Sequence, residues 1–297
     1  MTVEQTDSEI KKQVGAFYNE IGWKKESSGF FQNARYEDLR PVAREYIHRC
    51  HLRVNRFLQP SGRFLLDAGS GPVQWPEYLT YSQNYTYRIC LDISIVALSE
   101  ARTRLGDKGL YVVSDVAHLP FKSDVFDGLV SLHTLHHIPP LEQPDAYAGF
   151  VRVLKPDCSG VVVNAWTSPL FMEKMQGLVT LMDRVNGILR RLKFEKTDQP
   201  STENKTSPLS KPTGTYTLHI TPDWLKQNLK DRVDFKIFVW RSVSVRFLRS
   251  VIQPWLLGRF WLRILYWLEE RNPGYYGENG QYPLIVIRKL SPKMNRE

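Results

Sequence analysis

The chain has 297 residues, of which 42% are hydrophobic and 24% are charged, so it can bury a sizeable core as one large domain with insertions. The formal net charge of +9 is compatible with lipid headgroups, nucleic acid or acidic substrates as partners, and equally with solubility alone. Three scattered cysteines indicate neither a disulfide framework nor a zinc site, the polar residues 1–13 are unlike a secretory signal, and no apolar run reaches the ~18 residues of a membrane span. We therefore expect a cytoplasmic protein.

The N-terminal segment, residues 1–60, has the periodicity of helices. Helical spacing covers residues 9–21, and apolar residues recur at nearly helical intervals through residues 40–58. We expect these helices to form a lid or cap over the domain that follows.

Strand and helix signals alternate through residues 61–166. Strands are expected at 64–68, 88–92, 110–114, 126–132 and 160–166, and helices at 74–82, 94–105 and 143–154. This alternation indicates parallel strands with helices on both faces, and such sheets bind ligands at the carboxyl ends of their strands. The predicted fold class is α/β: a doubly wound, Rossmann-like, mostly parallel seven-stranded sheet with helices on both faces and helical insertions.

The pattern changes after Trp166. Residues 167–220 are expected to be an insertion, with an amphipathic helix at 171–192 and a polar, mobile stretch at 195–214. Residues 221–297 return to the core, with a helix at 222–230 and strands at 235–245 and 282–290.

Residues 246–281 separate those last two strands and form a second insertion, rich in aromatic and basic residues. Tryptophan, phenylalanine and leucine residues are interleaved with arginines at positions 246, 249, 259, 263 and 271. Aromatic residues at helical spacing usually pack into a core, and this is our expectation here. The alternative is peripheral membrane contact through residues 246–271, because basic, tryptophan-rich amphipathic helices lie in membrane interfaces.

A glycine-rich turn follows the first expected strand. After Asp67, Gly69 and Gly71 allow a sharp turn and a close approach of a ligand to the backbone. Asp92, about 20 residues further on, stands where a doubly wound fold places a carboxylate against ribose hydroxyls. A dinucleotide turn needs a small residue where this chain has Gln74, and no Gly-Lys-Ser/Thr phosphate loop is present. The pattern therefore predicts an adenosine cofactor without phosphates.

Five segments in order resemble the successive motifs of the class I S-adenosylmethionine (SAM)-dependent methyltransferases. They are residues 65–72, 90–94, 114–121, 126–133 and 153–156. The resemblance is closest to the small-molecule branch that includes quinone-biosynthesis and sugar O-methyltransferases. It implies that SAM is the cofactor, with Asp67, Gly69 and Gly71 near its methionine part, Asp92 at its ribose, Asp115 and Val116 at its adenine, and Ile93, Leu132 and His133 in the pocket wall.

The loop after the fourth expected strand carries His133, His136 and His137. Histidine titrates near neutral pH, which suits a general base for a hydroxyl nucleophile. Related small-molecule O-methyltransferases often carry Leu-His-His at this point, so the resemblance makes His136 or His137 the candidate base; the alternative for each is a packing role. Because the loop offers no cysteine and no carboxylate in helical register, we predict no metal site.

Four further side chains are candidates for contact with the acceptor. Tyr18 and Trp23 lie in a Phe-Tyr-Asn-Glu-Ile-Gly-Trp run that resembles the N-terminal segment of the family. Tyr216 and His219 precede the helix expected at 222–230 and are placed to reach the acceptor from there. Packing alone is an equally good interpretation of all four.

The predicted function is methyl transfer from SAM to a small-molecule or lipid-like acceptor, at an oxygen that His136 or His137 deprotonates. One alternative is carbon methylation of a quinone-type ring, which is acidic and needs less help from a base. Another is a non-catalytic protein that binds a membrane surface. Nucleic acid is not an expected partner, because the chain lacks the Asn/Asp-Pro-Pro-aromatic motif and any recognisable RNA-binding module.

Overall fold

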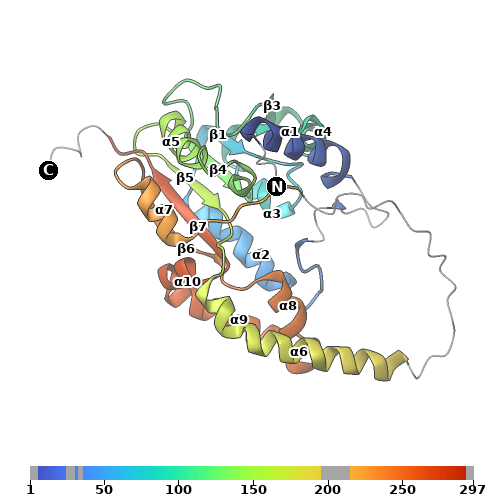
Figure 1. The fold of residues 1–297 in the computed structure, drawn as a ribbon. Coiled ribbons are helices and arrows are strands. Elements are labelled where there is room, and N and C mark those ends of the chain that lie inside the picture. Colours follow the sequence, from blue (N-terminus) through green and yellow to red (C-terminus); the bar gives the residue numbers. More distant parts are fainter. Residues whose placement is uncertain (1–5, 25–30, 33–35, 195–214, 292–297) are drawn as a thin grey trace.

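A seven-stranded sheet runs through the centre of the computed structural model, which describes residues 6–24, 31–32, 36–194 and 215–291 (Figure 1). The strand order is β3-β2-β1-β4-β5-β7-β6, and the first five strands are parallel while β7 runs antiparallel to both of its neighbours. The strands are β1 Gly62–Ala68, β2 Tyr85–Asp92, β3 Gly109–Val113, β4 Gly128–Leu132, β5 Ser159–Val163, β6 Asp234–Arg241 and β7 Tyr282–Arg288. The doubly wound, mostly parallel seven-stranded sheet predicted from the sequence is confirmed.

The first seven described helices along the chain begin and end within about six residues of their expected ranges, and three further helices lie between the last two strands. In chain order, the described helices are α1 Asp7–Phe17, α2 Arg44–Leu52, α3 Pro76–Thr80, α4 Ile95–Leu105, α5 Gln143–Val153, α6 Leu170–Phe194, α7 Pro222–Leu229, α8 Val245–Val251, α9 Gly258–Arg271 and α10 Pro273–Asn279. The helix expected at 9–21 ends as a π-helical turn, Tyr18–Gly22, and a 3₁₀ turn, Pro254–Leu256, precedes α9. The expected mobile stretch 195–214 lies outside the described residues.

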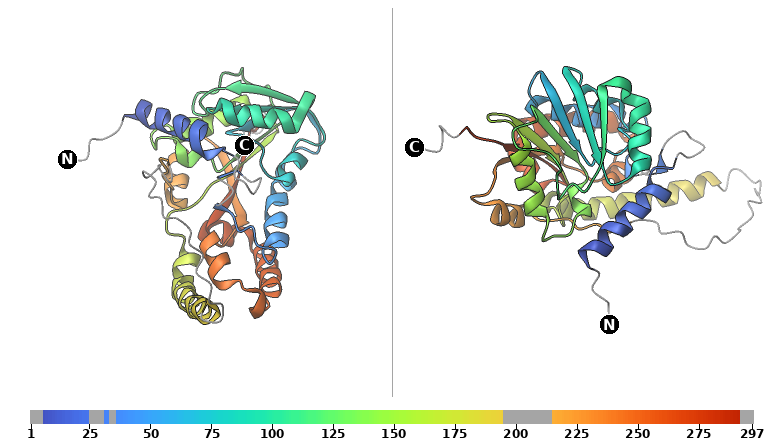
Figure 2. Two further views of the ribbon diagram at one scale, coloured as in Figure 1. Left: turned by 90° about the vertical axis from the view of Figure 1, so that its right-hand side faces the viewer. Right: turned by 90° about the horizontal axis from the view of Figure 1, so that it is seen from above.

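Helices cover both faces of the sheet because its inner strands are apolar on both sides. Successive side chains of a strand point to opposite faces, so Leu66 packs in the cluster that includes α5 and α7, while Leu65 packs in the cluster that includes α3 and α4. A third apolar cluster joins α2, α6, α8 and α9 at the end of the molecule away from β3 and α4 (Figure 2).

Strand β6 ends in a β-bulge at the carboxyl edge of the sheet. The register with β7 shifts between Val239 and Arg241, and Val239 faces Pro283, which has no backbone N–H to donate. The carbonyl of Trp240 instead accepts a hydrogen bond from Arg53 Nη1 (2.8 Å). This bulge turns both Trp240 and Arg241 into the same cavity.

The fully buried carboxylate of Glu269, on α9, joins α2 and α9 to the end of β6. Its Oε1 accepts hydrogen bonds from the Tyr46 hydroxyl (2.6 Å) and the Ser242 backbone N–H (2.9 Å). Arg53 Nη2 approaches Oε2 at 2.9 Å as an ion pair. A buried charge is tolerated only when it is paired, so these contacts fix the three elements together.

The aromatic residues of the insertion between β6 and β7 do not share one environment. Phe247, Leu248 and Leu262 are buried, as expected for core residues. For Trp255, Trp261 and Trp267 the core expectation is wrong, because each side chain is more than half exposed. None of the described helices combines the length and apolarity that crossing a bilayer requires.

Candidate functional site

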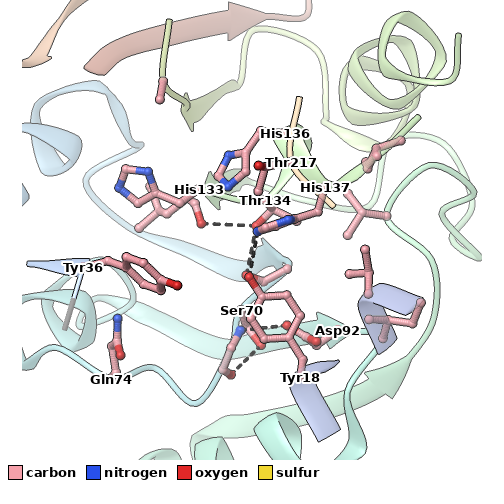
Figure 3. Close-up of a pocket in the computed structure, with 18 of the residues that line it drawn as sticks. Tyr18, Tyr36, Ser70, Gln74, Asp92, His133, Thr134, His136, His137 and Thr217 are labelled. Atoms are coloured by element: carbon pink, nitrogen blue, oxygen red, sulfur yellow. Dashed lines mark hydrogen bonds between the residues drawn. The ribbon is translucent and has the colours of Figure 1, made fainter. Parts of the chain in front are cut away.

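A cavity of about 510 Å³ opens at the carboxyl ends of the parallel strands, a size within the usual range for ligand pockets (Figure 3). Its walls come from α1 and the turn after it, from the loops that follow β1, β2, β3 and β4, and from the facing ends of β6 and β7. This is where a doubly wound sheet was expected to hold its ligand.

The glycine turn after β1 forms one wall. Gly69 has φ +77°, and a Cβ there would lie 2.2 Å from Thr134 Cγ2; Gly71 has φ +52°, and its Cβ would lie 3.0 Å from the Trp23 ring. Any side chain at either position would be strained and would clash with Thr134 or Trp23. The two glycines therefore let these side chains pack directly against the backbone of the turn in the cavity wall.

Asp92 lies beside this turn at the end of β2. Its Oδ2 accepts the Gly71 N–H (2.8 Å) and its Oδ1 accepts the Ser94 N–H (2.8 Å), which fixes the orientation of the carboxylate in the cavity wall. Burial outweighs these hydrogen bonds and raises the pKa of Asp92 to about 6. Each oxygen keeps a lone pair for a ligand hydroxyl.

Asp67 lies in the cavity wall but is committed to a structural pair. Arg88, on β2, donates to Asp67 Oδ2 through Nε (2.9 Å) and Nη2, and both residues are buried. Burial raises the pKa of Asp67 and Arg88 opposes that rise. Sequence reasoning missed Arg88, which stands in an otherwise apolar strand.

Asp115, the expected adenine contact, is bound by the N-terminal helix. Lys11 Nζ lies 2.6 Å from Asp115 Oδ2 and also forms an ion pair with Glu142. Burial would raise the pKa of Asp115, but the hydrogen bond from Lys11 and the Ala117 N–H outweigh it and lower the pKa. The expected contact with adenine requires the free side of this carboxylate.

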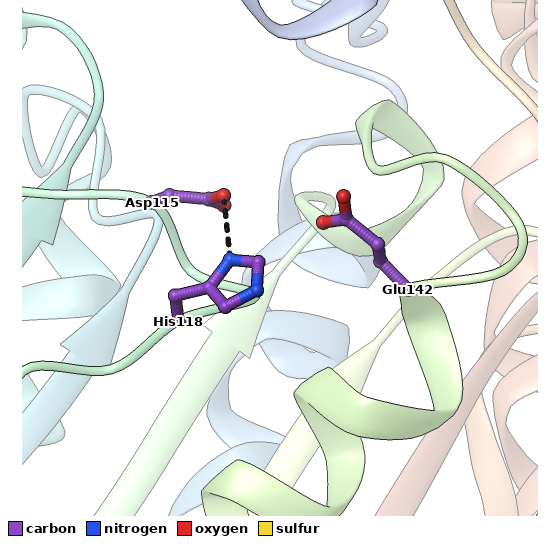
Figure 4. A group of neighbouring side chains, drawn as sticks. All are labelled: Asp115, His118 and Glu142. Carbon is purple, nitrogen blue, oxygen red and sulfur yellow. Dashed lines mark hydrogen bonds and ion pairs between the residues drawn. The ribbon is translucent and has the colours of Figure 1, made fainter. Parts of the chain in front are cut away.

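Asp115, His118 and Glu142 also form the one group with metal-ligand spacing among the described residues (Figure 4). Their ligand atoms lie within 4.8 Å of one another. Because the Lys11 ammonium already pairs both carboxylates, a divalent ion would have to displace it.

His137 has a fixed tautomer. Its Nδ1 lies 2.7 Å from the Tyr216 carbonyl oxygen, which can only accept, so Nδ1 carries the proton. Its Nε2 therefore accepts the hydrogen bond from the Tyr18 hydroxyl at 2.7 Å (Figure 3). Burial lowers the pKa of His137 to about 4, so the ring is neutral at neutral pH.

The other two histidines of the loop occupy different surroundings. His136 donates from Nδ1 to Asn164 Oδ1 (3.1 Å), its ring lies 4.2 Å from that of His137, and burial lowers its pKa well below the ordinary value. His133, at φ +55°, packs edge-on against Trp240 (4.9 Å), and burial lowers its pKa to about 3.

Most of the remaining sequence candidates line the cavity. Tyr18 and Trp23 stack on each other (5.3 Å), and His219 packs 5.1 Å from His136. Ile93, Val116 and Leu132 also line the cavity. Tyr216 contributes its backbone carbonyl to His137, and its side chain is not part of the lining.

The far end of the cavity contains residues that sequence reasoning missed. Trp240 and Arg241 enter from the bulge of β6, and Glu37 pairs with Arg241 (2.5 Å). Pro283 opposite the bulge was the available signal, because proline weakens a strand ladder. The partner Glu37 had no signal, since it lies 204 residues away.

Comparison with known proteins finds a domain match within the chain and a shared fold. Residues 66–162 match a family model described as a methyltransferase domain. A geranyl diphosphate C-methyltransferase from Streptomyces coelicolor A3(2) has 12% identity and a TM-score of 0.54, covering 95% of this chain and 98% of that chain. A phosphoethanolamine N-methyltransferase from Haemonchus contortus has 12% identity and a TM-score of 0.54, covering 98% of this chain and 52% of that chain.

The cyclase SpnF, which has 17% identity and a TM-score of 0.50, covers 95% of this chain and 97% of its own. Identities this low establish the fold and not the acceptor. No curated protein sequence matches the chain significantly.

The depressed pKa of His137 predicts a loss of stability in acid. Between its folded pKa of about 4 and the ordinary histidine pKa of 6.5, the unfolded chain binds a proton that the folded chain does not, so the free energy of unfolding falls as the pH falls through this window. The stability advantage of wild type over His137→Gln should shrink by up to about 2 kcal/mol between about pH 7 and about pH 5, since one pKa unit is worth ~1.4 kcal/mol.

Urea unfolding of both proteins across this range measures the difference. Asp92, whose raised pKa acts in the opposite direction, is present in both and cancels. A stability difference that does not change with pH would contradict the prediction.

Proposed function

We propose that this chain, a class I SAM-dependent methyltransferase by its domain at residues 66–162 and by its fold, transfers a methyl group to a hydroxyl oxygen of a small-molecule or lipid-like acceptor. The observation that carries the proposal is the hydrogen bond from the Tyr18 hydroxyl to the unprotonated Nε2 of His137 at the cavity wall. It already holds a hydroxyl against a neutral imidazole, which is the arrangement that proton removal from an acceptor needs.

The cavity presents polar groups that suit SAM. The backbone of the glycine turn would meet the methionine part, Asp92 would present its carboxylate to the ribose hydroxyls, and Asp115 and Val116 would face the adenine. When bound, SAM supplies an electrophilic methyl group on a sulfonium sulfur. The protein's part is to align the acceptor oxygen with that methyl group and to exclude water.

Tyr18 and His137 would move the acceptor's proton. The acceptor hydroxyl gives its proton to the Tyr18 oxygen while the Tyr18 proton passes to His137 Nε2, and the Tyr216 carbonyl holds the other ring nitrogen protonated. His136, fixed by Asn164 and packed against His137, would position that ring. Transfer of the methyl group from bound SAM to that oxygen would break the carbon–sulfur bond and leave a neutral thioether.

Cofactor binding should depend on Asp92. Asp92→Asn should weaken SAM binding about tenfold or more, because charge-assisted hydrogen bonds to the ribose are worth roughly 1.5–3 kcal/mol. Isothermal titration calorimetry with SAM and with S-adenosylhomocysteine measures the change. Asp127→Asn is the matched control, since Asp127 pairs with Lys155 outside the cavity; equal affinities for Asp92→Asn and wild type would remove Asp92 from the site.

Catalysis should depend on the Tyr18–His137 pair as a unit. Tyr18→Phe and His137→Gln should each lower kcat by roughly 10²–10⁴, the usual range for a general base, with little change in SAM affinity. Because the two groups form one relay, the double variant should be no slower than the slower single variant.

Transfer of a labelled methyl group from SAM into a small-molecule extract measures the rate. His48→Gln, an exposed substitution outside the cavity, is the control. Near-normal rates in both Tyr18→Phe and His137→Gln would favour carbon methylation of a quinone-type ring, which needs less help from a base.

We also propose that residues 246–271 contact a membrane surface peripherally. Trp255, in the turn before α9, is 54% exposed, and Trp261 and Trp267, on α9, are 53% and 55% exposed, whereas Glu269 on α9 is buried. A helix of a water-soluble surface usually places its apolar side inward, and here large apolar side chains face outward. Arg259 is exposed beside them and forms no ion pair with any described residue, which complements anionic headgroups.

The three tryptophans should carry this contact. Replacing Trp255, Trp261 and Trp267 together by Ala should weaken binding to phosphatidylserine-containing vesicles about tenfold or more, because these side chains supply the apolar area that enters the interface. Vesicle sedimentation measures binding, and thermal melting should show a folded protein because the side chains are exposed. Leu141→Ala, another exposed apolar site, is the control; unfolding of the triple variant would instead identify the tryptophans as structural.

A further inference from the structure

The charged side chains that line the described part of the cavity are already paired with one exception. Lys11 pairs with Asp115 and Glu142, Arg241 pairs with Glu37, and Asp67 pairs with Arg88 behind the wall. Asp92 is the exception, and its role at a ribose accounts for it. No described cation of the lining is therefore left to balance an anionic acceptor.

The end of the cavity away from the glycine turn is built of aromatic rings. Trp240 and Tyr282 meet edge to face (5.8 Å), and His51 stacks on Trp240 (5.2 Å) while packing against Tyr78 (5.3 Å). Trp75 adds a further ring to this wall. Trp240, His51 and Tyr78 are themselves buried, so the ring surface open to a ligand comes from Tyr282 and Trp75, which are partly exposed. Such ring surface favours a planar ring as ligand, through stacked or edge-on contacts.

A cationic acceptor does not fit against these rings, because the Arg241 guanidinium already lies over them. Its Cζ lies 5.2 Å from the centre of the Trp240 ring and 4.6 Å from that of Tyr282. An ammonium group drawn to the same ring faces would have to displace the guanidinium from them. The bulge of β6 thus brings Trp240 and Arg241 together and closes this end to cations.

From these contacts we infer that the acceptor is an uncharged, planar aromatic compound that carries the reacting hydroxyl. The inference rests on the proposed function and names the substrate class of that site. Glu37 is the residue that sets the selectivity: it neutralises Arg241, and without that neutralisation the guanidinium would attract a carboxylate or a phosphate.

Matched single-ring probes test this inference. We would measure binding of para-ethylphenol, para-hydroxybenzoate and para-ethylcyclohexanol by calorimetry, with the protein saturated with S-adenosylhomocysteine. Para-ethylphenol should bind about tenfold or more tightly than the other two probes. The carboxylate of para-hydroxybenzoate would find no free cation, and the cyclohexane ring of para-ethylcyclohexanol is not flat. Weaker or equal binding of para-ethylphenol against either probe, or binding of none of the three, overturns the inference.

A gain of binding gives the second test. Glu37→Gln leaves the Arg241 charge unpaired and should raise the affinity for para-hydroxybenzoate about tenfold relative to para-ethylphenol, as expected for a charge-assisted pair. Asp38→Asn is the matched control, because Asp38 is a buried carboxylate next in sequence that pairs with Arg40 outside the cavity lining. An unchanged preference in a folded Glu37→Gln protein contradicts the role of Glu37.

The calorimetry also distinguishes a failure of the proposed function from a failure of the inferred acceptor class. If S-adenosylhomocysteine does not bind the wild-type protein, the proposed function fails. If it binds while the order of the probes differs from the one expected, the function stands and only the acceptor class is wrong.

Discussion

The buried carboxylate of Glu269 is the constraint on which the end of the cavity beside β6 depends. A charge without solvent must be neutralised and hydrogen-bonded, or the folded state loses several kcal/mol. Glu269 satisfies this requirement with groups from α2 and from the residue after β6. Arg53, its partner, also binds the Trp240 carbonyl, so the two charged residues hold the backbone on both sides of Arg241. These contacts fix the position of the cavity wall that Trp240 and Arg241 form.

The site shows a division between groups arranged for the protein's own stability and groups left available to ligands. Asp67, Asp115 and Arg241 are each neutralised by a partner from another element, so the cavity presents aromatic faces and neutral imidazoles with little net charge. Low local polarity strengthens each remaining polar contact. The hydrogen bonds of Asp92 and the Tyr18–His137 hydrogen bond are therefore stronger than they would be in water. The same low polarity keeps the histidines neutral.

The sheet, the glycine turn and the position of Asp92 could be predicted from the sequence because each depends on local patterns. Alternation of strands and helices fixes a parallel sheet, and glycine at positive φ fixes the turn. The partners of Asp67, Asp115 and Arg241 could not be predicted, since Arg88, Lys11 and Glu37 are brought to them by tertiary packing between distant segments. Composition also could not decide the place of Trp255 and Trp261, because a core helix and a membrane-facing helix use the same residues.

Lys11 joins α1 to the loops after β3 and β4, and α1 continues directly into the turn that carries Tyr18 and Trp23 over the cavity. This segment of the cavity wall is thus held in place by the ion pairs of Lys11. Partly exposed ion pairs weaken as salt is added. Rising ionic strength would therefore shorten the residence time of a bound nucleoside. The turnover rate would be set by how often the Lys11 ion pairs open.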